Sequence, residues 1–285
     1  MKTITLFLGT NLAVLTLLGL ILPMLGANNT VELLIFALIF GMGGSFISLA
    51  LSKTMAKKMT GAHVIEEPSN SAEEWLFDTV RRQAQSAGIA MPEVAIYDSE
   101  DVNAFATGMN RNSALVAVTT GLLHAMEQSE VEAVLAHEVS HVANGDMVTL
   151  ALIQGVINTF IFVLARVIGQ IIDQVIFKNK QGYGPGYYIG SIIAEIVLGI
   201  LASIIVMWFS RHREFHADAG SARLVGANKM ISALKRLQMG HTGQLPDQLA
   251  AFGINASQGK SLMQSLFRSH PPLEDRIIAL QQSRY

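Results

Sequence analysis

Two consecutive stretches of this sequence, Thr3–Val31 and Leu33–Ser52, contain no charged residue. A helix needs about 20 apolar residues to cross a hydrocarbon core of about 30 Å, and inside that core every backbone polar group must find a partner within the chain. Both stretches are long enough, so we predict a membrane hairpin. A cleaved signal peptide is the alternative for the first stretch, because Lys2 precedes it and small residues follow at Gly26 and Ala27.

Two further apolar blocks follow later in the chain, at residues 147–177 and 188–209. Each is long enough to span a membrane, but Arg166 lies inside the third block and Glu195 inside the fourth. Ionisable residues are costly within a membrane and need an explanation. With a rise of about 1.5 Å per residue, antiparallel helices would bring the two side chains to similar depth. We therefore expect either an Arg166–Glu195 ion pair or an Arg166 side chain that extends to the far interface.

Basic residues near the ends of the predicted spans indicate their orientation. Lys2 precedes the first span and Lys53 follows the second, whereas the loop between these spans has no basic residue. The positive-inside rule then places both ends of this hairpin in the cytoplasm. The polar residues 53–146 would be cytosolic, as would everything after Arg211. Two lysines between the third and fourth spans point the other way, so a re-entrant hairpin is the alternative for that pair.

The composition restricts the remaining possibilities. Hydrophobic residues make up 51% of the sequence and charged residues only 15%, which is too apolar for an ordinary soluble protein. The formal net charge of −2 gives no sign of nucleic-acid binding. Because the chain has no cysteine, it can form neither disulfides nor thiolate metal sites. Histidine, aspartate or glutamate must hold any metal ion.

The segment His137–His141 reads His-Glu-Val-Ser-His. Positions four apart lie on one face of a helix, so both imidazoles can reach one metal ion, with Glu138 beside it as a general base. This is the H-E-x-x-H pattern of zinc peptidases. The preceding Ser129–Glu132 has the spacing of a capping box. We therefore expect a helix that begins there and ends near Gly145.

A catalytic zinc ion usually has three protein ligands and a water molecule, so a third ligand must lie elsewhere. We expect the third ligand to be Glu214. It lies near the start of a predicted helix that begins around Arg213 and ends at Gly226. Asp218 follows four residues later and would accept the free ring N–H of a ligating histidine. Taken alone, the two carboxylates would more often be solvated surface groups, but the H-E-x-x-H motif reverses this preference. His216 is the rival third ligand, but it cannot point the same way as Glu214 from one helix.

The polar regions predict a mostly helical fold with a small sheet. Residues 71–88 have helical spacing of apolar residues, residues 121–126 and 229–238 suggest shorter helices, and Pro271-Pro272 introduces a final helix to Gln282. Residues 240–260 read as a loop. Three runs have the pattern of strands, the last two forming a hairpin: Glu93–Tyr97, Ala104–Thr107 and Ala114–Thr119.

Four motifs together give the chain a family resemblance: His137–His141, Glu214–Asp218, Asn103–Gly108 and His270–Arg276. With the layout of the apolar blocks, they resemble the HtpX-type membrane zinc metalloproteases over essentially the whole chain. These bacterial heat-shock peptidases are similar in their catalytic domain to the CAAX prenyl endopeptidases. The resemblance implies a mainly α membrane protein with four transmembrane helices and a cytosolic zincin-like α+β catalytic domain that contains a small β-sheet.

The resemblance also implies roles for individual residues. One Zn²⁺ per chain would be held by His137, His141 and Glu214, with Glu138 as general base. His270 and Arg276 would lie near the scissile carbonyl, where His270 could donate to the oxyanion. The alternatives are a plain helix-entry residue for His270 and a surface charge for Arg276.

The segment that begins at Asn103, Ala104 and Phe105 would be an edge strand that binds extended substrate by strand addition. The alternative for this segment is an ordinary hairpin edge.

The expected layout is a membrane hairpin at 1–52, catalytic regions at 53–147 and 211–285, and a second hairpin at 148–210. The implied function is cleavage of misfolded or damaged membrane proteins, or of other unfolded proteins, at the cytosolic face under stress. The chain would be a multi-pass protein of the bacterial inner membrane with both termini cytoplasmic.

Two other functions use the same residues. An intramembrane metalloprotease is disfavoured because Glu127, Asn144 and Asp146 make the surroundings of the motif too polar for hydrocarbon. A membrane metal transporter or sensor is disfavoured because its ligands would lie at mid-membrane depth.

Overall fold

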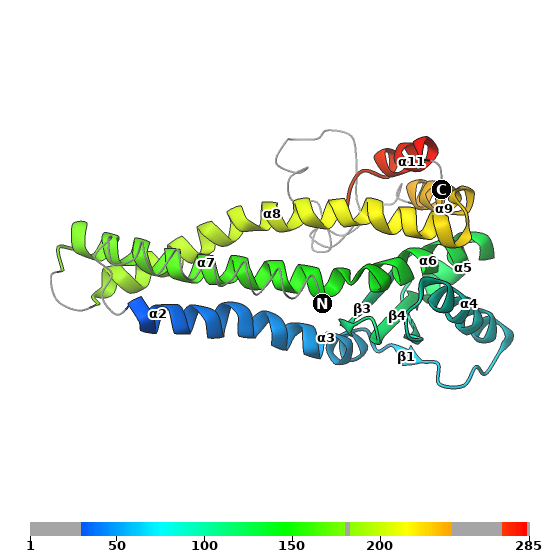
Figure 1. Cartoon of the computed structure of the whole chain (residues 1–285), viewed down its shortest axis with the longest axis horizontal. Coiled ribbons are helices and arrows are strands. Elements are labelled where there is room, and N and C mark those ends of the chain that lie inside the picture. Colours follow the sequence, from blue (N-terminus) through cyan, green and yellow to red (C-terminus); the bar gives the residue numbers. More distant parts are fainter. Residues whose placement is uncertain (1–29, 180–182, 241–269, 284–285) are drawn as a thin grey trace. The chain divides into compact units, whose positions relative to one another are not determined.

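The computed structural model describes residues 30–179, 183–240 and 270–283. Within these residues the chain is mostly helical, with one small sheet (Figure 1). The elements in chain order are α2 (Thr30–Ala37), the π-helix η1 (Leu38–Gly43), α3 (Gly44–Thr60), β1 (His63–Val64), α4 (Ser71–Ala87), β2 (Glu93–Tyr97), β3 (Ala104–Asn110), β4 (Ser113–Thr119), α5 (Thr120–Ala125), α6 (Gln128–Asn144), α7 (Asp146–Val175), α8 (Pro185–Val225), α9 (Ala227–Gly240) and α11 (Leu273–Gln282).

The contacts divide the chain into two compact units. One unit contains the described parts of residues 1–48 and 149–206, and the other contains those of 49–148 and 207–285. Each unit is therefore built from two separate stretches of sequence.

Three helices in the described part of the chain are long and apolar enough to cross a membrane: Val31–Thr60, Asp146–Val175 and Pro185–Val225. They contain the second, third and fourth predicted spans. Nearly all of the first predicted span, Thr3–Val31, lies outside the described residues, as does the loop expected at 240–260.

Small residues bring two of the apolar helices close together in the first unit. A Cβ atom built on Gly41 would lie 2.4 Å from the Oγ1 atom of Thr159, so α7 approaches the π-helix there with no room for a larger residue. Next to this contact, Ala37 packs against Val163 and Val167. Such close contacts suit membrane helices, whose association relies on packing because lipid tails are as apolar as the side chains.

The predicted ion pair between Arg166 and Glu195 is present. The Nη1 atom of Arg166 donates to the Oε2 atom of Glu195 at 2.6 Å, which joins α7 to α8. The guanidinium also lies over the ring of Phe162, with its Cζ atom 3.9 Å from the ring centroid. Arg166 and Glu195, the two ionisable residues singled out within the apolar blocks, therefore partner each other.

The expected new helix around Arg213 is not observed, because α8 runs without interruption from Pro185 to Val225. No proline and no glycine lies between Gly199 and Gly220, so nothing in that stretch breaks the helix. The charged residues from Arg211 onward lie on the same continuous helix as the apolar residues before them. Gly226, at φ +98°, follows its last residue, as expected for a helix C-terminus.

The second unit is organised around a four-stranded sheet with the order β1-β2-β4-β3. Strands β2 and β4 are parallel, whereas β1 and β3 pair antiparallel with their neighbours and form the two edges. The two-residue strand β1 was not predicted from the sequence.

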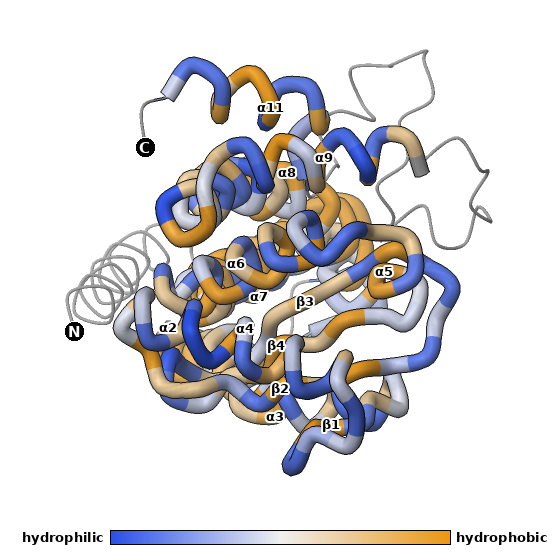
Figure 2. Tube along the Cα trace, turned by 90° about the vertical axis from the view of Figure 1, so that its right-hand side faces the viewer, coloured by the Kyte–Doolittle hydropathy of each residue, from blue (hydrophilic) through white to orange (hydrophobic). Residues whose placement is uncertain are grey.

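Side chains of the sheet alternate between its two faces. On one face, Val94 and Val116 join the main core, to which α4, α6, α9 and α11 contribute. On the other face, Ala95, Leu115 and Ala117 pack near Ala56 of α3. Orange and blue segments alternate along α9 and α11 in Figure 2, as expected for helices that bury one face.

The predicted capping box at Ser129–Glu132 is wrong by two residues. The helix begins at Gln128, and the backbone N–H of Glu127 donates to the Oε2 atom of Glu130 at 3.0 Å. Glu130, rather than Glu132, is the glutamate of the capping box, and its carboxylate also accepts hydrogen bonds from Ser232 and Arg236 of α9. This contact anchors the helix that carries the H-E-x-x-H motif.

Candidate metal centre

The two motif histidines lie on the same face of α6, as their spacing predicts. Their Nε2 atoms are 3.1 Å apart, and their rings meet edge to face with centroids 4.6 Å apart. Both side chains are largely buried beneath α8. The helix ends at Asn144, three residues after His141, where Gly145 takes the left-handed conformation at φ +71°.

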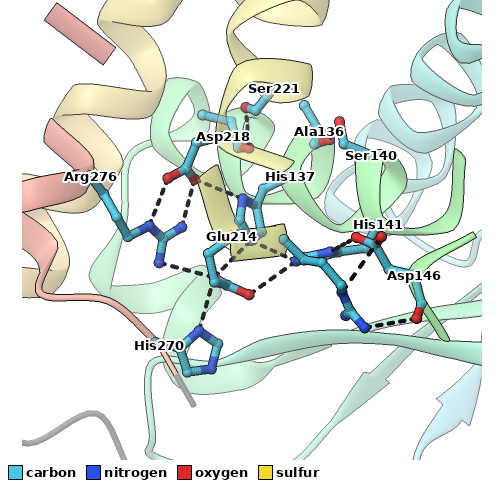
Figure 3. A network of polar contacts seen from close by, with 12 residues as sticks. Ala136, His137, Ser140, His141, Asp146, Glu214, Asp218, Ser221, His270 and Arg276 are labelled. Carbon is cyan, nitrogen blue, oxygen red and sulfur yellow. Dashed lines mark hydrogen bonds and ion pairs between the residues drawn. The ribbon is translucent and has the colours of Figure 1, made fainter. Parts of the chain in front are cut away.

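Glu214 of α8 faces the two histidines (Figure 3). Its Oε1 atom lies 3.4 Å from the Nε2 atom of His141, and its Oε2 atom lies 3.5 Å from the Nε2 atom of His137. These three residues form a buried group whose ligand atoms all lie within 4.8 Å of one another, close enough to hold a metal ion.

The close packing of α8 on α6 brings Glu214 to this position. A Cβ atom on Gly220 would lie 2.6 Å from the Cβ atom of Ser140, so only glycine allows this approach. One residue further, the buried hydroxyl of Ser221 donates to the backbone oxygen of Ala133 at 2.8 Å. Two successive residues therefore fix α8 against the helix that carries the histidines.

A carboxylate lies behind each histidine. The Nδ1 atom of His137 is 2.9 Å from the Oδ1 atom of Asp218, and the Nδ1 atom of His141 is 2.6 Å from the Oδ2 atom of Asp146. Asp218 was expected in this role, but Asp146 was missed. The sequence did contain a sign of this contact: the helix-ending residue Gly145 is followed at once by a carboxylate. Asp146 is thus close enough in the chain to reach His141.

Each of these carboxylates contacts an arginine. Arg276 of α11 donates to both oxygens of Asp218, at 2.7 Å from Nε and 2.6 Å from Nη2, and its Nη1 atom lies 3.3 Å from Glu214. Arg213 of α8 approaches Asp146 and was not expected to take part. Arg276 is only 4% exposed, so the alternative of a surface charge does not apply to it.

Glu138 lies between the two histidines in sequence and is half-buried. Loss of contact with water raises the pKa of its carboxyl group, although the neighbouring histidines act in the opposite direction. A raised pKa makes the carboxylate a better proton acceptor, which suits a general base.

His270 lies just before α11, and its Nδ1 atom is 2.9 Å from the Oε2 atom of Glu214. His216, the rival third ligand, is exposed, and its Nδ1 atom lies 2.9 Å from the backbone oxygen of His212. It is not a member of the group that could hold a metal ion. The site therefore includes His270 but not His216.

Asn103, Ala104 and Phe105 lie at the start of the edge strand β3. The backbone oxygen of Asn103 accepts from the N–H of Thr119 at 3.0 Å, which ties this end of the strand to β4. The ring of Phe105 packs against Tyr97, with centroids 5.7 Å apart. The structure thus places the three residues at a sheet edge, but gives them no direct contact with the two histidines.

The donor set fits a divalent metal ion. Both Nδ1 atoms face carboxylates, so the two Nε2 atoms and the carboxylate of Glu214 are left to share a positive charge between them. Without a metal ion, the surrounding carboxylates favour a protonated histidine. Burial lowers the pKa of His141, but its bonds with Asp146 and Glu214 outweigh this effect and raise the pKa to about 10. A metal ion would replace the proton, because imidazole binds metals in its neutral form.

A helix with two histidines and an adjacent glutamate, completed by a carboxylate from another helix, defines a metallopeptidase type of centre. Comparison with known sequences agrees with this class. The sequence model of peptidase family M48 matches residues 70–284.

Curated relatives match over nearly the whole length. The chain is 62% identical to Protease HtpX of Thioalkalivibrio sulfidiphilus, with 99% of both chains covered. It is 61% identical to a Protease HtpX homolog of Nitrosomonas europaea, with 99% of this chain and 100% of the relative covered. The chain therefore belongs to peptidase family M48. It is a membrane metalloprotease, and proteases of this family use zinc.

A solved structure shares the fold. The crystal structure of S. mikatae Ste24p aligns with a TM-score of 0.66 at 20% identity. The alignment covers 95% of this chain and 62% of the Ste24p chain. The resemblance to HtpX-type proteases and to the CAAX endopeptidase fold is thus confirmed.

Proposed function

We propose that this protein is a zinc-dependent endopeptidase that cleaves misfolded or damaged membrane proteins, and other unfolded proteins, at the cytosolic face of the bacterial inner membrane. One Zn²⁺ per chain would be bound by His137, His141 and Glu214. The convergence of these three side chains beside Glu138 is the observation that carries the proposal. The high identity to relatives named as proteases supports it.

The chain's own groups account for the proton transfers of peptide hydrolysis. A bound zinc ion would activate a water molecule and polarise the peptide carbonyl. Glu138 would take the proton from the attacking water and give it to the leaving amine. The raised pKa of Glu138 supports this role, because the group must hold the proton between the two transfers.

His270 and Arg276 would act differently from each other. Since the Nδ1 atom of His270 is held near Glu214, its Nε2 atom is the one left to donate to the oxyanion that forms at the scissile carbonyl. Arg276 is buried against Asp218 and Glu214. We therefore place Arg276 as a positioning residue, which holds the orientation of both carboxylates and makes no contact with the substrate.

The edge strand β3 would bind the substrate backbone. It is paired on one side with β4 only, and it packs beside α6. An extended peptide could add to its other side through backbone hydrogen bonds, with Asn103, Ala104 and Phe105 nearest the end of the strand. This arrangement suits an enzyme that acts on unfolded segments, because most of the backbone of a folded substrate is already hydrogen-bonded within that substrate.

The proposed topology follows from the basic residues. Residues 1–52 and 148–210 would form two membrane hairpins, and residues 53–147 and 211–285 would form the catalytic region in the cytoplasm, together with both termini. Reporter enzymes fused after Lys53, Lys178 and Gln282 test this topology. Cytoplasmic signals after Lys53 and Gln282 are expected, and a periplasmic signal at either position contradicts it.

The activity is tested with full-length protein in detergent, loaded with zinc and mixed with unfolded casein. Wild-type protein is expected to degrade casein, and Glu138→Gln to bind zinc at the same stoichiometry with a loss of activity of about 10²-fold or more. Equal casein loss with both proteins would remove Glu138 from the mechanism. Membrane-protein substrates are tested with the same pair of proteins in vesicles that contain a misfolded reporter.

A further inference from the structure

The turn between α6 and α7 places a buried carboxylate against one metal ligand. Helix α6 ends before Gly145, and α7 begins at Asp146. Gly145 takes the left-handed conformation between the two helices, and the Oδ2 atom of Asp146 lies 2.6 Å from the Nδ1 atom of His141. Asp146 is only 6% exposed, so water cannot replace this contact easily.

Arg213 holds Asp146 in turn. Its Nη1 atom donates to the backbone oxygen of Asp146 at 2.8 Å, and its Nε atom lies 3.5 Å from the Oδ1 atom. Arg213 immediately precedes Glu214, so neighbouring residues of α8 supply one metal ligand and the group that fixes the carboxylate behind another.

This contact determines which nitrogen of His141 can bind a metal. An Nδ1 atom that donates to a carboxylate leaves the Nε2 atom as the free acceptor and fixes the orientation of the ring. The Nε2 atom of His141 is the one that faces Glu214, at 3.4 Å. Figure 3 shows Asp146 beside His141 on one side of Glu214, and Asp218 with Arg276 on the other. Both histidines are thus backed by an aspartate that an arginine contacts.

We propose that Asp146 and Arg213 form a positioning pair that orients His141 for zinc and so sets the affinity of the site. The proposal rests on the zinc endopeptidase function proposed above. Carboxylates behind ligating histidines typically change metal affinity by about 10- to 100-fold. Loss of the pair should therefore weaken zinc binding at His141 and leave Glu138 and the substrate strand intact.

Asp146 also lies in the first turn of α7, where a carboxylate favours the helix terminus. The test must separate these two effects. Asp146→Asn keeps the size of the side chain and an oxygen able to cap the helix, but loses the charge that holds the His141 ring. Asp146→Ala loses both. A purely structural role predicts normal zinc affinity for Asp146→Asn, whereas the positioning role predicts a loss for both variants.

The experiment measures zinc affinity of the full-length protein in detergent by competition with a chelating dye, and records the visible spectrum of the Co²⁺-loaded protein. Asp146→Asn and Arg213→Gln are expected to bind zinc about 10- to 100-fold more weakly and to shift the Co²⁺ bands. Arg213→Lys should lie between wild type and Arg213→Gln. The control is Asp78→Asn, which breaks the exposed contact of Asp78 with Arg81, 2.9 Å in length, and should behave as wild type.

Zinc affinity within twofold of wild type for both Asp146→Asn and Arg213→Gln, with unchanged Co²⁺ bands, would overturn the positioning role. If one variant fails to fold, as judged by its thermal midpoint, the other and Arg213→Lys still decide the question. Wild-type protein that binds no zinc would instead reject the proposed function itself, so the two failures are distinct.

Discussion

Gly220 is the residue whose replacement most directly tests how the metal centre is assembled. A Cβ atom at this position would lie 2.4 Å from the Oγ atom and 2.6 Å from the Cβ atom of Ser140. Ordinary carbon–carbon contacts are about 3.5–4.0 Å. In Gly220→Ala, α8 must therefore move away from α6 by roughly 1 Å at this point, because Ser140 is too short to turn aside.

The stability change is the difference between two opposing effects. Overpacking a well-packed contact costs about 1–3 kcal/mol, whereas alanine in place of glycine within a helix gains about 1 kcal/mol. We expect a net loss of about 0–2 kcal/mol. Glu214 belongs to the same helix, so it should move with Gly220, and ligand distances tolerate only about 0.2 Å. Zinc affinity should thus fall about tenfold or more, which corresponds to about 1.4 kcal/mol.

The assay is a zinc competition titration together with thermal unfolding in detergent. Gly199→Ala is the matched control, because a Cβ atom on this glycine of α8 meets no atom of the described residues within 4 Å. Adding Ser140→Gly to Gly220→Ala should restore much of the zinc affinity by removing the clash. If Gly220→Ala binds zinc as tightly as wild type, close packing of α8 on α6 does not set the position of Glu214.

Three further outcomes are expected. Removal of zinc with a chelator should abolish casein cleavage and lower the thermal midpoint, and re-added zinc should restore both; unchanged melting would contradict a bound ion. Arg276→Ala should lower the free energy of unfolding by about 3–5 kcal/mol, because it leaves Asp218 as a buried charge without its partner. A thermal midpoint near that of wild type would contradict this. Burial raises the pKa of Glu130, but bonds from Glu127, Ser232 and Arg236 outweigh this and lower it. Its contribution to stability is therefore present above pH about 4.5 and is lost as pH falls through the lowered pKa, so thermal midpoints of wild type and Glu130→Gln should converge in acid.

Local sequence patterns predicted much of the fold. Alternating apolar residues located β2 and β4, helical spacing located α4, and long apolar blocks located three apolar helices within the described residues. The motif spacing was enough to bring His137 and His141 together, because residues four apart on a helix must share a face. Asp218, four residues after Glu214, lies with its Oδ1 atom 2.9 Å from the Nδ1 atom of His137.

The features that the sequence did not reveal depend on contacts between distant segments. The parallel pairing of β2 with β4 arises because β3 returns to the far side of β4, which no local pattern indicates. A new helix was expected to begin at Arg213 because the sequence becomes polar there. That prediction mistook a change in polarity for the start of a helix. Arg213 itself was missed because its partner Asp146 is remote in sequence and becomes a neighbour only when α8 packs on α6.

The pairing of carboxylates with arginines has a consequence for which ion the site accepts. Four acidic side chains surround the two histidines, but two guanidinium groups balance only two of them: the acids are Glu138, Asp146, Glu214 and Asp218, and the bases are Arg213 and Arg276. With neutral imidazoles and with Glu138 ionised, the protein would thus contribute a surplus of two negative charges around the site. A doubly charged cation makes this region electrically neutral, whereas a monovalent ion would leave it negative and a trivalent ion would leave it positive. The formal charges of the site would thus favour a divalent cation, and ligand geometry and size would select among divalent ions.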